Sequence, residues 1–410
     1  MITVFTVTAI TASTVTVTVF TVMKIMAVEE NPFVYGEVVP LDSFVDRTDE
    51  MSRLVRNLTS SQKIFLISPR RYGKSSLIRH VLASLAKQKV LTLEVTVSSF
   101  SSYVAFLEGY ARALVSLETK ADRARTWLQE VFTSIRPEVR YEMKPTGGAQ
   151  VALSFPTARS NRDIARLAEE VFALPAHIAE RQKRRVVIAL DEFQAVTQFD
   201  GGTVEHALRA AVQQQRQVGY IFAGSEPSLM EQMISPKRPF YKAGPVMRLQ
   251  KVPADVFARF IETRFKRSGI KAEAGLGMAI VDLANNIPYD VQRLAHETWD
   301  DAQAARRRGV NLEDLHATLH RLLAEQDMLF EGVWQRLTLP QRATLRAVVL
   351  EQGREVLSAE IRTRYRLGAS SSVQHSLTAL QREDLVARDD DGHYVAVDSL
   401  FREWVARKTY

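Results

Sequence analysis

The chain has 410 residues, of which 46% are hydrophobic and 25% charged. This composition is typical of a globular protein of several domains and excludes a disordered, collagenous or membrane-bundle protein. The 54 Lys and Arg residues outnumber the 47 Asp and Glu residues and give a net charge of +7, which permits a nucleic-acid or nucleotide partner without requiring one. The lack of cysteine excludes disulfides, thiolate catalysis and cysteine-based zinc sites, and it fits a reducing, cytoplasmic location.

The first residues have an unusual composition. Residues 1–23 carry no charge and are rich in threonine and valine, and TVTVTVFTV at 14–22 alternates with the period of a strand. The many hydroxyl groups argue against a transmembrane helix, and no basic segment marks a signal peptide, so we expect no membrane association. Two interpretations of residues 1–28 stay open: a β-prone extension, or an artefact of an upstream start codon with Met23 or Met26 as the true start. We favour the artefact, because ordinary sequence begins at Glu29.

The middle of the chain alternates between helical and strand-like segments. Helical spacing or composition predicts helices over 44–58, 77–88, 103–135, 161–181 and 204–215. Short apolar runs predict strands over 63–68, 90–97, 150–155, 184–193 and 218–225, with a linker bearing Gly and Pro over 137–148. Strands that alternate with helices predict a parallel α/β sheet.

The rest of the chain has a different pattern of predicted elements. From about Pro253 to Glu331 the pattern is almost wholly helical, and helices over 337–350 and 373–385 precede two short strands over 385–397. Helices followed by a β-hairpin indicate a winged helix-turn-helix. We therefore expect an α/β core at 29–252, a helical unit at 253–330 and a winged helix at 331–410, after the doubtful 1–28.

The segment between the predicted strand 63–68 and helix 77–88 has the context of a phosphate-binding P-loop, with Ser68 in place of the first glycine. Gly73 allows the tight turn that points successive N–H groups at phosphate oxygens. Lys74 would reach the β- and γ-phosphates of a nucleotide, and Ser75 would ligate Mg²⁺. The expected nucleotide-contacting residues are Ser68, Pro69, Arg70, Arg71, Tyr72, Gly73, Lys74, Ser75 and Ser76.

A second motif lies about 120 residues downstream. The apolar run VVIALDEF at 186–193 carries two carboxylates to the end of a predicted strand. Asp191 would hold Mg²⁺ through water, and Glu192 would polarise the water that attacks the γ-phosphate. A strand that ends in a solvated Asp-Glu pair is the simpler alternative, but the P-loop upstream favours the catalytic interpretation.

Three more residues are candidates for the same chemistry. The predicted strand 218–225 ends at Ser225, which either senses the γ-phosphate or is a simple strand-end hydroxyl. Arg238 and Arg248 follow, and either could be an arginine finger supplied to a neighbouring subunit of a homo-oligomer.

At this point the sequence resembles the archaeal-type ATPases, a branch of the AAA+/STAND P-loop NTPases. The similarity covers about residues 30–405, and its two motifs at the nucleotide site are each moderately specific and stronger together. The matching segments are NPF at 31–33, FVDR at 44–47, ISPRRYGKSSL at 67–77, ALDEFQ at 189–194, AGSEPSLM at 223–230, PFY at 239–241, IPYDVQRLAHETW at 287–299 and LFREW at 400–404. Asp46 stands where the family's first motif has glycine.

The resemblance implies an AAA+-like parallel α/β core, a helical lid and a C-terminal winged helix. It also implies ATP bound between core and lid, with Pro32 and Phe33 near the adenine and Arg293 at the sensor-2 position. It does not name a biological task, and a protein partner stays unknown.

Two functions compete, besides a nucleotide-stabilised scaffold without turnover, against which the presence of Glu192 argues. The first is an ATP-hydrolysing switch that acts on a partner through a conformational cycle. The second is an ATP-regulated DNA-binding protein, whose recognition helix at 370–383 would bury Val373, Leu377 and Leu380 and expose Ser371, Gln374, His375, Thr378 and Arg382. Residues 331–410 hold 12 basic and 11 acidic residues, a net charge of +1, and three aspartates at 389–391 would repel a DNA backbone. The winged helix therefore fits a protein-interaction module as well as a DNA reader.

Overall fold

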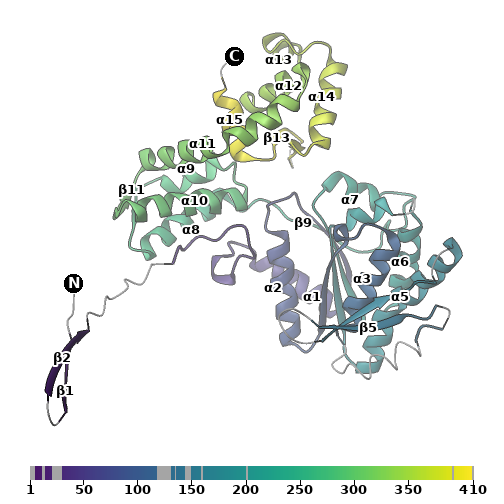
Figure 1. Cartoon of the computed structure of the whole chain (residues 1–410). Helices are drawn as coiled ribbons and strands as arrows, with labels where there is room; N and C mark the ends of the chain where they lie inside the picture. The colour runs from purple at the N-terminus through teal and green to yellow at the C-terminus, as the bar shows by residue number, and fades with distance from the viewer. Residues whose placement is uncertain are drawn as a thin grey trace.

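The computed structural model of the chain describes residues 5–11, 14–20, 30–117, 131–133, 135–143, 149–157, 160–199, 202–389 and 392–408. Strands β1 (Phe5–Thr11) and β2 (Thr14–Phe20) form an antiparallel hairpin, which agrees with the period-two alternation of residues 14–22. Beyond it, Figure 1 shows a sheet with helices on both faces, a layer of helices, and a C-terminal helical unit. None of the described helices is both long and apolar enough to cross a membrane.

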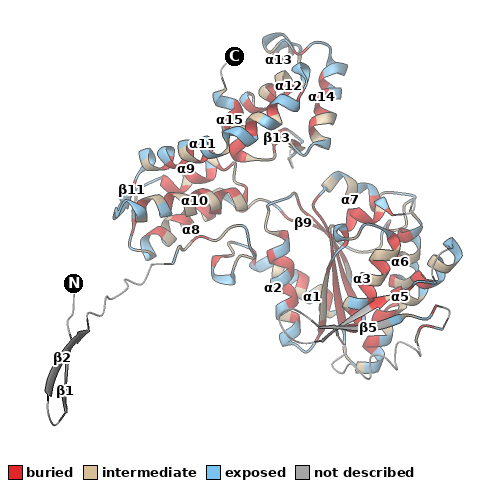
Figure 2. Cartoon of the chain, viewed as in Figure 1, coloured by how far each residue is buried: buried red, intermediate tan, exposed pale blue. Residues whose placement is uncertain are grey.

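The core of the described chain is a parallel sheet in the order β4-β7-β8-β3-β9. Its strands are β3 (Lys63–Ile67), β4 (Leu91–Thr96), β7 (Val186–Asp191), β8 (Val218–Gly224) and β9 (Val246–Arg248). Every residue of the two central strands, β7 and β8, is buried, because helices cover both faces of the sheet (Figure 2). That double burial explains why these strands are continuous apolar runs instead of alternating ones.

The helices divide between the two faces of the sheet. Helices α1 (Thr48–Thr59) and α2 (Lys74–Lys87) pack with Ile64, Leu66 and Val187 on one face. Helices α3 (Tyr103–Val115), α5 (Asn161–Gln182) and α6 (Thr203–Gln214) cover the other, with short α7 (Pro227–Met233) beside them. Turns of 3-10 helix, η1 (Leu41–Ser43), η2 (Val97–Ser99) and η3 (Phe193–Gln198), complete this part.

The lid and the winged helix share one hydrophobic core. The lid contains α8 (Ala254–Arg267), β10 (Lys271–Ala272), α9 (Leu276–Leu283), α10 (Pro288–Ala304), β11 (Gly309–Val310) and α11 (Leu312–Arg336). Helix α11 runs past the expected boundary at 330, and its buried Trp334 packs against Trp404 of the winged helix. The two units are therefore joined by a continuous helix.

The C-terminal part contains α12 (Leu339–Leu350), α13 (Ala359–Arg364), α14 (Ser370–Arg382), β12 (Val386–Arg388), β13 (Tyr394–Ala396) and α15 (Ser399–Arg407). Strands β12 and β13 pair antiparallel as the wing. The expected recognition helix is α14, and it buries Val373, Leu377 and Leu380 completely. The residues expected to face outward are exposed: Ser371, Gln374, His375, Thr378 and Arg382.

One sequence-based prediction about local structure was wrong and another is confirmed in part. The expected linker at 137–148 contains β5 (Glu138–Met143), which pairs antiparallel with β6 (Ala149–Ser154). The alternation of Val139, Tyr141 and Met143 with polar residues is the strand signal that the interpretation overlooked. The helical prediction for 103–135 is confirmed by α3 as far as Val115, and residues 118–130 lie outside the described part of the chain.

Candidate functional site

The two sequence motifs meet at one edge of the sheet. The P-loop follows β3, Asp191 and Glu192 end β7, and Ser225 follows β8. Because these neighbouring strands are parallel, their carboxyl ends lie side by side. The Ser68 N–H donates to the Gly224 carbonyl at 3.1 Å and links the start of the loop to the end of β8.

The backbone of the P-loop has the turn that the sequence predicts. Gly73 has a φ of 86° and is the N-cap of α2, whose first residue is Lys74. Arg71 also has a positive φ, of 70°, so the loop contains two left-handed residues within three positions. The N–H groups at the N-terminus of α2 lack helical partners, and together with the helix dipole they form an anion-binding position.

Lys74 is buried between the two carboxylates that follow β7. Its Nζ pairs with Asp191 Oδ1 and lies 3.3 Å from Glu192 Oε1. Ser75 Oγ donates to Asp191 Oδ2 at 3.2 Å. A buried cation thus balances the buried Asp191 and the partly buried Glu192. A hydroxyl and a carboxylate oxygen, both hard donors that suit Mg²⁺, lie side by side.

Glu192 is held in a defined orientation. Its backbone is left-handed, with a φ of 52°. Ser225 Oγ donates to Glu192 Oε2 at 2.5 Å, and Gln194 Nε2 donates to the same oxygen at 2.6 Å. Burial disfavours the ionised form of Glu192, but the Lys74 ammonium and these two hydrogen bonds outweigh it and lower the pKa of the carboxyl. Glu192 is therefore a carboxylate at neutral pH.

Gln194 is a residue to which the sequence analysis gave no role. Its Nε2 lies within 3.4 Å of Ser225 Oγ and within 3.3 Å of Glu226 Oε1, besides its bond to Glu192. It follows the carboxylate pair by two positions, in a turn of 3-10 helix that returns its side chain to the strand end. That short spacing is the signal that could have identified it.

A cavity of about 270 Å³ opens beside the P-loop, between the core and the lid. Its wall includes residues 69–76 of the P-loop, Glu192 and Ser225. Apolar and aromatic side chains also line it: Val34, Tyr35, Val39, Phe44, Val45, Val252, Phe257, Pro288 and Tyr289. Arg47 and Gln292, both buried, add polar groups to the wall. A largely apolar cleft bordered by an anion-binding loop is suited to a nucleotide.

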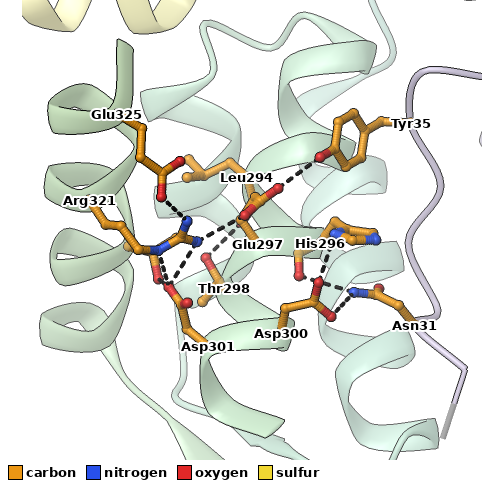
Figure 3. A network of polar contacts seen from close by, with 11 residues as sticks. Asn31, Tyr35, Leu294, His296, Glu297, Thr298, Asp300, Asp301, Arg321 and Glu325 are labelled. Atoms are coloured by element: carbon orange, nitrogen blue, oxygen red, sulfur yellow. Dashed lines mark hydrogen bonds and ion pairs between the residues drawn. The ribbon is translucent and has the colours of Figure 1, made fainter. Parts of the chain in front are cut away.

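A polar network fixes the position of Tyr35 in that wall (Figure 3). The Tyr35 hydroxyl donates to Glu297 Oε1 at 2.7 Å, and Arg321 Nη2 of α11 donates to Glu297 Oε2 at 2.8 Å. Arg321 also pairs with Asp301. Burial and the bond to Glu297 raise the pKa of Tyr35 to about 12, so this side chain stays a neutral aromatic donor. The chain before the core is thereby tied to the lid.

Several residues expected at the nucleotide lie elsewhere. The described wall of the cavity does not include Pro32, Phe33 or Arg293. Phe33 is 1% exposed, its ring centroid lies 5.0 Å from that of Phe265 in the lid core, and its N–H donates to Asn31 Oδ1 at 3.0 Å. Tyr35 takes the place at the wall that Phe33 was expected to have. Arg293 faces Gln326 of α11.

Ser68 and the two candidate arginine fingers also lie outside the cavity wall. Ser68 is fully buried, and its hydroxyl donates to the Pro69 carbonyl at 3.0 Å. Arg238 pairs with buried Glu205 at 2.6 Å, and Arg248 pairs with Glu231 at 2.9 Å. Both arginines therefore have intramolecular partners, and the finger role stays a prediction.

The P-loop arginines contact other parts of the chain. Arg71 Nη1 lies 3.6 Å from Asp290 Oδ1 of α10 and 2.9 Å from Asp398 Oδ2. Arg70 Nη1 lies 2.8 Å from Asp384 Oδ2, just after α14. Burial raises the pKa of Asp290 from 3.8 to about 6. The positive charge of Arg71 offsets part of this shift, and the negative charge of Asp398 adds to it.

This pKa predicts a pH-dependent effect of Asp290→Asn. A raised carboxyl pKa means that the folded state binds this proton more tightly than the unfolded state, so the wild type loses stability as pH rises from about 4 to about 6. The amide does not titrate. We therefore expect the melting temperature of the variant, relative to the wild type, to be higher at about pH 7 than at about pH 4. A difference that is constant with pH would contradict the assignment.

Comparison with known families and structures agrees with this architecture. The profile of a family described as an ATPase domain predominantly from Archaea matches residues 44–276, and that of a probable winged helix domain matches residues 328–407. A Walker-type ATPase of Pyrococcus abyssi is similar over 91% of this chain and 99% of that chain, with 16% identity and a TM-score of 0.60. The Orc1 protein of Aeropyrum pernix, solved in complex with DNA, is similar over 90% of this chain and 94% of its own, with 17% identity and a TM-score of 0.49. No protein of curated function matches the sequence.

At these identities the likeness to the Pyrococcus abyssi structure shows the fold alone. The ATPase profile reaches from Phe44 to Leu276, which is more than half of the chain, and it includes the P-loop, the carboxylate pair and Ser225. The chain belongs to the family of ATPase domains found predominantly in Archaea, and it carries a C-terminal winged helix.

Proposed function

We propose that the chain binds ATP in the cavity between sheet and lid and hydrolyses it. The observation that carries the proposal is the position of Glu192, which lines the cavity together with the P-loop and is oriented by Ser225 and Gln194. A charged carboxylate beside a phosphate-binding loop can hold a water in line with the γ-phosphate. Membership of an ATPase family supports ATP as the nucleotide.

Each residue of the site has a role in this proposal. The N–H groups of residues 73–76 and the Lys74 ammonium bind the β- and γ-phosphates. Ser75 and Asp191 would hold Mg²⁺, which supplies positive charge to the phosphates when bound. Ser225 and Gln194 keep Glu192 aimed at the cavity, and Tyr35, Phe257 and Tyr289 form an apolar place for the base.

The direct test is ATP hydrolysis by the full chain, with Lys74→Ala as the comparison. We expect Mg²⁺-dependent phosphate release from ATP by the wild type. Lys74→Ala removes a charge-assisted contact to phosphate, worth about 1.5–3 kcal/mol, so the affinity for ATP should fall by about 10- to 100-fold. Calorimetric titration and a phosphate-release assay measure the two effects. A wild type that neither binds nor hydrolyses ATP would refute the proposal.

A second candidate function is ATP-regulated DNA binding through α14. The exposed row Gln374, His375 and Thr378 presents polar groups that can contact bases in a major groove. The nearly neutral charge of residues 331–410 and Asp389 beside the wing oppose it. Duplex binding by the full chain, with and without ATP and across salt concentrations, separates DNA binding from a protein-interaction role. Mass in solution with ATP tests the homo-oligomer.

A further inference from the structure

The P-loop is bound to the winged helix by two ion pairs that span most of the chain. Arg70 Nη1 donates to Asp384 Oδ2 at 2.8 Å across a separation of 314 residues, and Arg71 Nη1 donates to Asp398 Oδ2 at 2.9 Å across 327 residues. These contacts join the nucleotide-binding loop of the core to the domain that would recognise a partner.

Both carboxylates come from well-defined positions. Asp398 is the N-cap of α15, where its Oδ1 accepts the Phe401 N–H at 2.9 Å. Asp384 lies just after the end of α14, in a left-handed conformation with a φ of 56°. Neither carboxylate sits on a long flexible side chain, so the arginines meet acceptors that the winged helix holds in fixed places.

Arg71 also joins the lid to this contact. Its carbonyl accepts the Tyr289 N–H at 3.2 Å, its guanidinium lies 5.4 Å from the centre of the Tyr289 ring, and Asp290 is its second carboxylate. Asp290 Oδ2 in turn accepts the Ser399 N–H at 3.3 Å. Core, lid and winged helix therefore converge on one P-loop residue.

The same two arginines line the cavity in which the phosphates of ATP would lie. Guanidinium groups bind phosphate at least as well as carboxylate, and bonds between two ionised groups are the strong ones. The Arg70 pair is about half exposed on both sides, at 53% and 50%, and such exposed pairs contribute about 0–1 kcal/mol. A triphosphate can displace a contact of that strength.

We propose that Arg70 and Arg71 form a latch that docks the winged helix on the P-loop. The phosphates of ATP release this latch, because they compete with Asp384 and Asp398 for the same guanidinium groups. The latch rests on the proposed ATP binding and adds a regulatory step to it. The carboxylates and the phosphates compete for the same guanidinium groups, and such coupling is reciprocal. Weakening the contact between the arginines and the carboxylates must therefore tighten ATP binding.

The test is the double variant Asp384→Asn/Asp398→Asn in the full chain. Asparagine keeps the capping oxygen of residue 398 and removes the charge, so α15 should remain folded. The matched control is Glu383→Gln, which removes one charge from the exposed position beside Asp384. We expect a non-hydrolysable ATP analogue to bind the double variant about 5- to 10-fold more tightly than the wild type, and adenosine, which lacks phosphates, to bind both equally.

A distance measurement tests the release itself. Because the chain has no cysteine, Gln88→Cys at the end of α2 and Ser372→Cys on the exposed face of α14 can carry a fluorophore pair. In the labelled chain with the native carboxylates, ATP should lower energy transfer between the two fluorophores. In the labelled double variant, energy transfer should already be low before ATP is added. Unchanged ATP affinity and transfer in the double variant would overturn the latch alone. A wild type that binds no ATP would overturn the proposed function and, with it, the latch.

Discussion

A Glu192→Gln variant is expected to bind ATP as tightly as the wild type and to hydrolyse it about 10²–10⁴ times more slowly. The amide has nearly the shape of the carboxylate, so Ser225 can still donate to its oxygen, and the Lys74–Asp191 pair stays intact. What is lost is the negative charge that accepts a hydrogen bond from water. Single-turnover phosphate release and calorimetric ATP binding measure the two quantities separately.

The low pKa of Glu192 makes this prediction more specific. A carboxylate that Lys74, Ser225 and Gln194 hold ionised is a weak base, so its role is to orient and polarise the water and not to store a proton near neutral pH. We therefore expect wild-type turnover to vary little between about pH 6 and about pH 8 through this group.

The matched control is Glu226→Gln. Glu226 accepts a hydrogen bond from the same Gln194 amide at 3.3 Å, but its side chain is exposed. Removing the charge of Glu226 should change turnover by less than about 3-fold, which corresponds to a change of well under 1 kcal/mol in the activation free energy. Equal losses in the two variants would show that general charge at this edge, and not the position of Glu192, supports hydrolysis.

The central residues of the site could be predicted from sequence because each depends on a local signal. Lys74 follows a glycine between a buried strand and a helix, and Asp191, Glu192 and Ser225 each come at or just after the end of an apolar run. Once the sheet is parallel, strand ends meet at one edge without any long-range information. The same local logic identified the buried and exposed faces of α14.

The features that sequence reasoning missed depend on docking between distant segments. Phe33 and Tyr35 both lie near the lid, and their places depend on distant partners as well as local ones: the Phe33 N–H donates to Asn31, and the Tyr35 hydroxyl donates to Glu297. The assignment of the P-loop arginines to phosphate stays a prediction, and what sequence reasoning missed is that they pair with Asp384 and Asp398. No periodicity encodes a pair of side chains more than 300 residues apart.

The largest effect on stability is expected from Phe222→Ala. Phe222 lies on the central strand β8, is 0% exposed and contacts the rings of Phe65, Phe193 and Phe240 at centroid distances of 5.1, 4.6 and 5.2 Å. Removing a buried phenyl ring costs about 3–5 kcal/mol of unfolding free energy, because both its burial and its packing are lost. Phe193 directly follows Glu192, so the variant should also disturb the orientation of the carboxylate and slow hydrolysis.

The measurement must report on the sheet itself, because three of the four tryptophans, Trp299, Trp334 and Trp404, lie in the lid and the winged helix. Hydrogen exchange of peptides from β7 and β8 reports directly on the core, and we expect their protection to fall while that of α12 and α14 is retained.

The control is Phe260→Ala on α8, where the ring is half-buried, and it should cost less than about 1.5 kcal/mol of unfolding free energy. If the two variants lose equal protection in β8, the aromatic cluster is not what stabilises this strand. Normal protection with slow hydrolysis would instead mean that the cluster acts by placing Phe193, and through it Glu192, at the edge of the sheet.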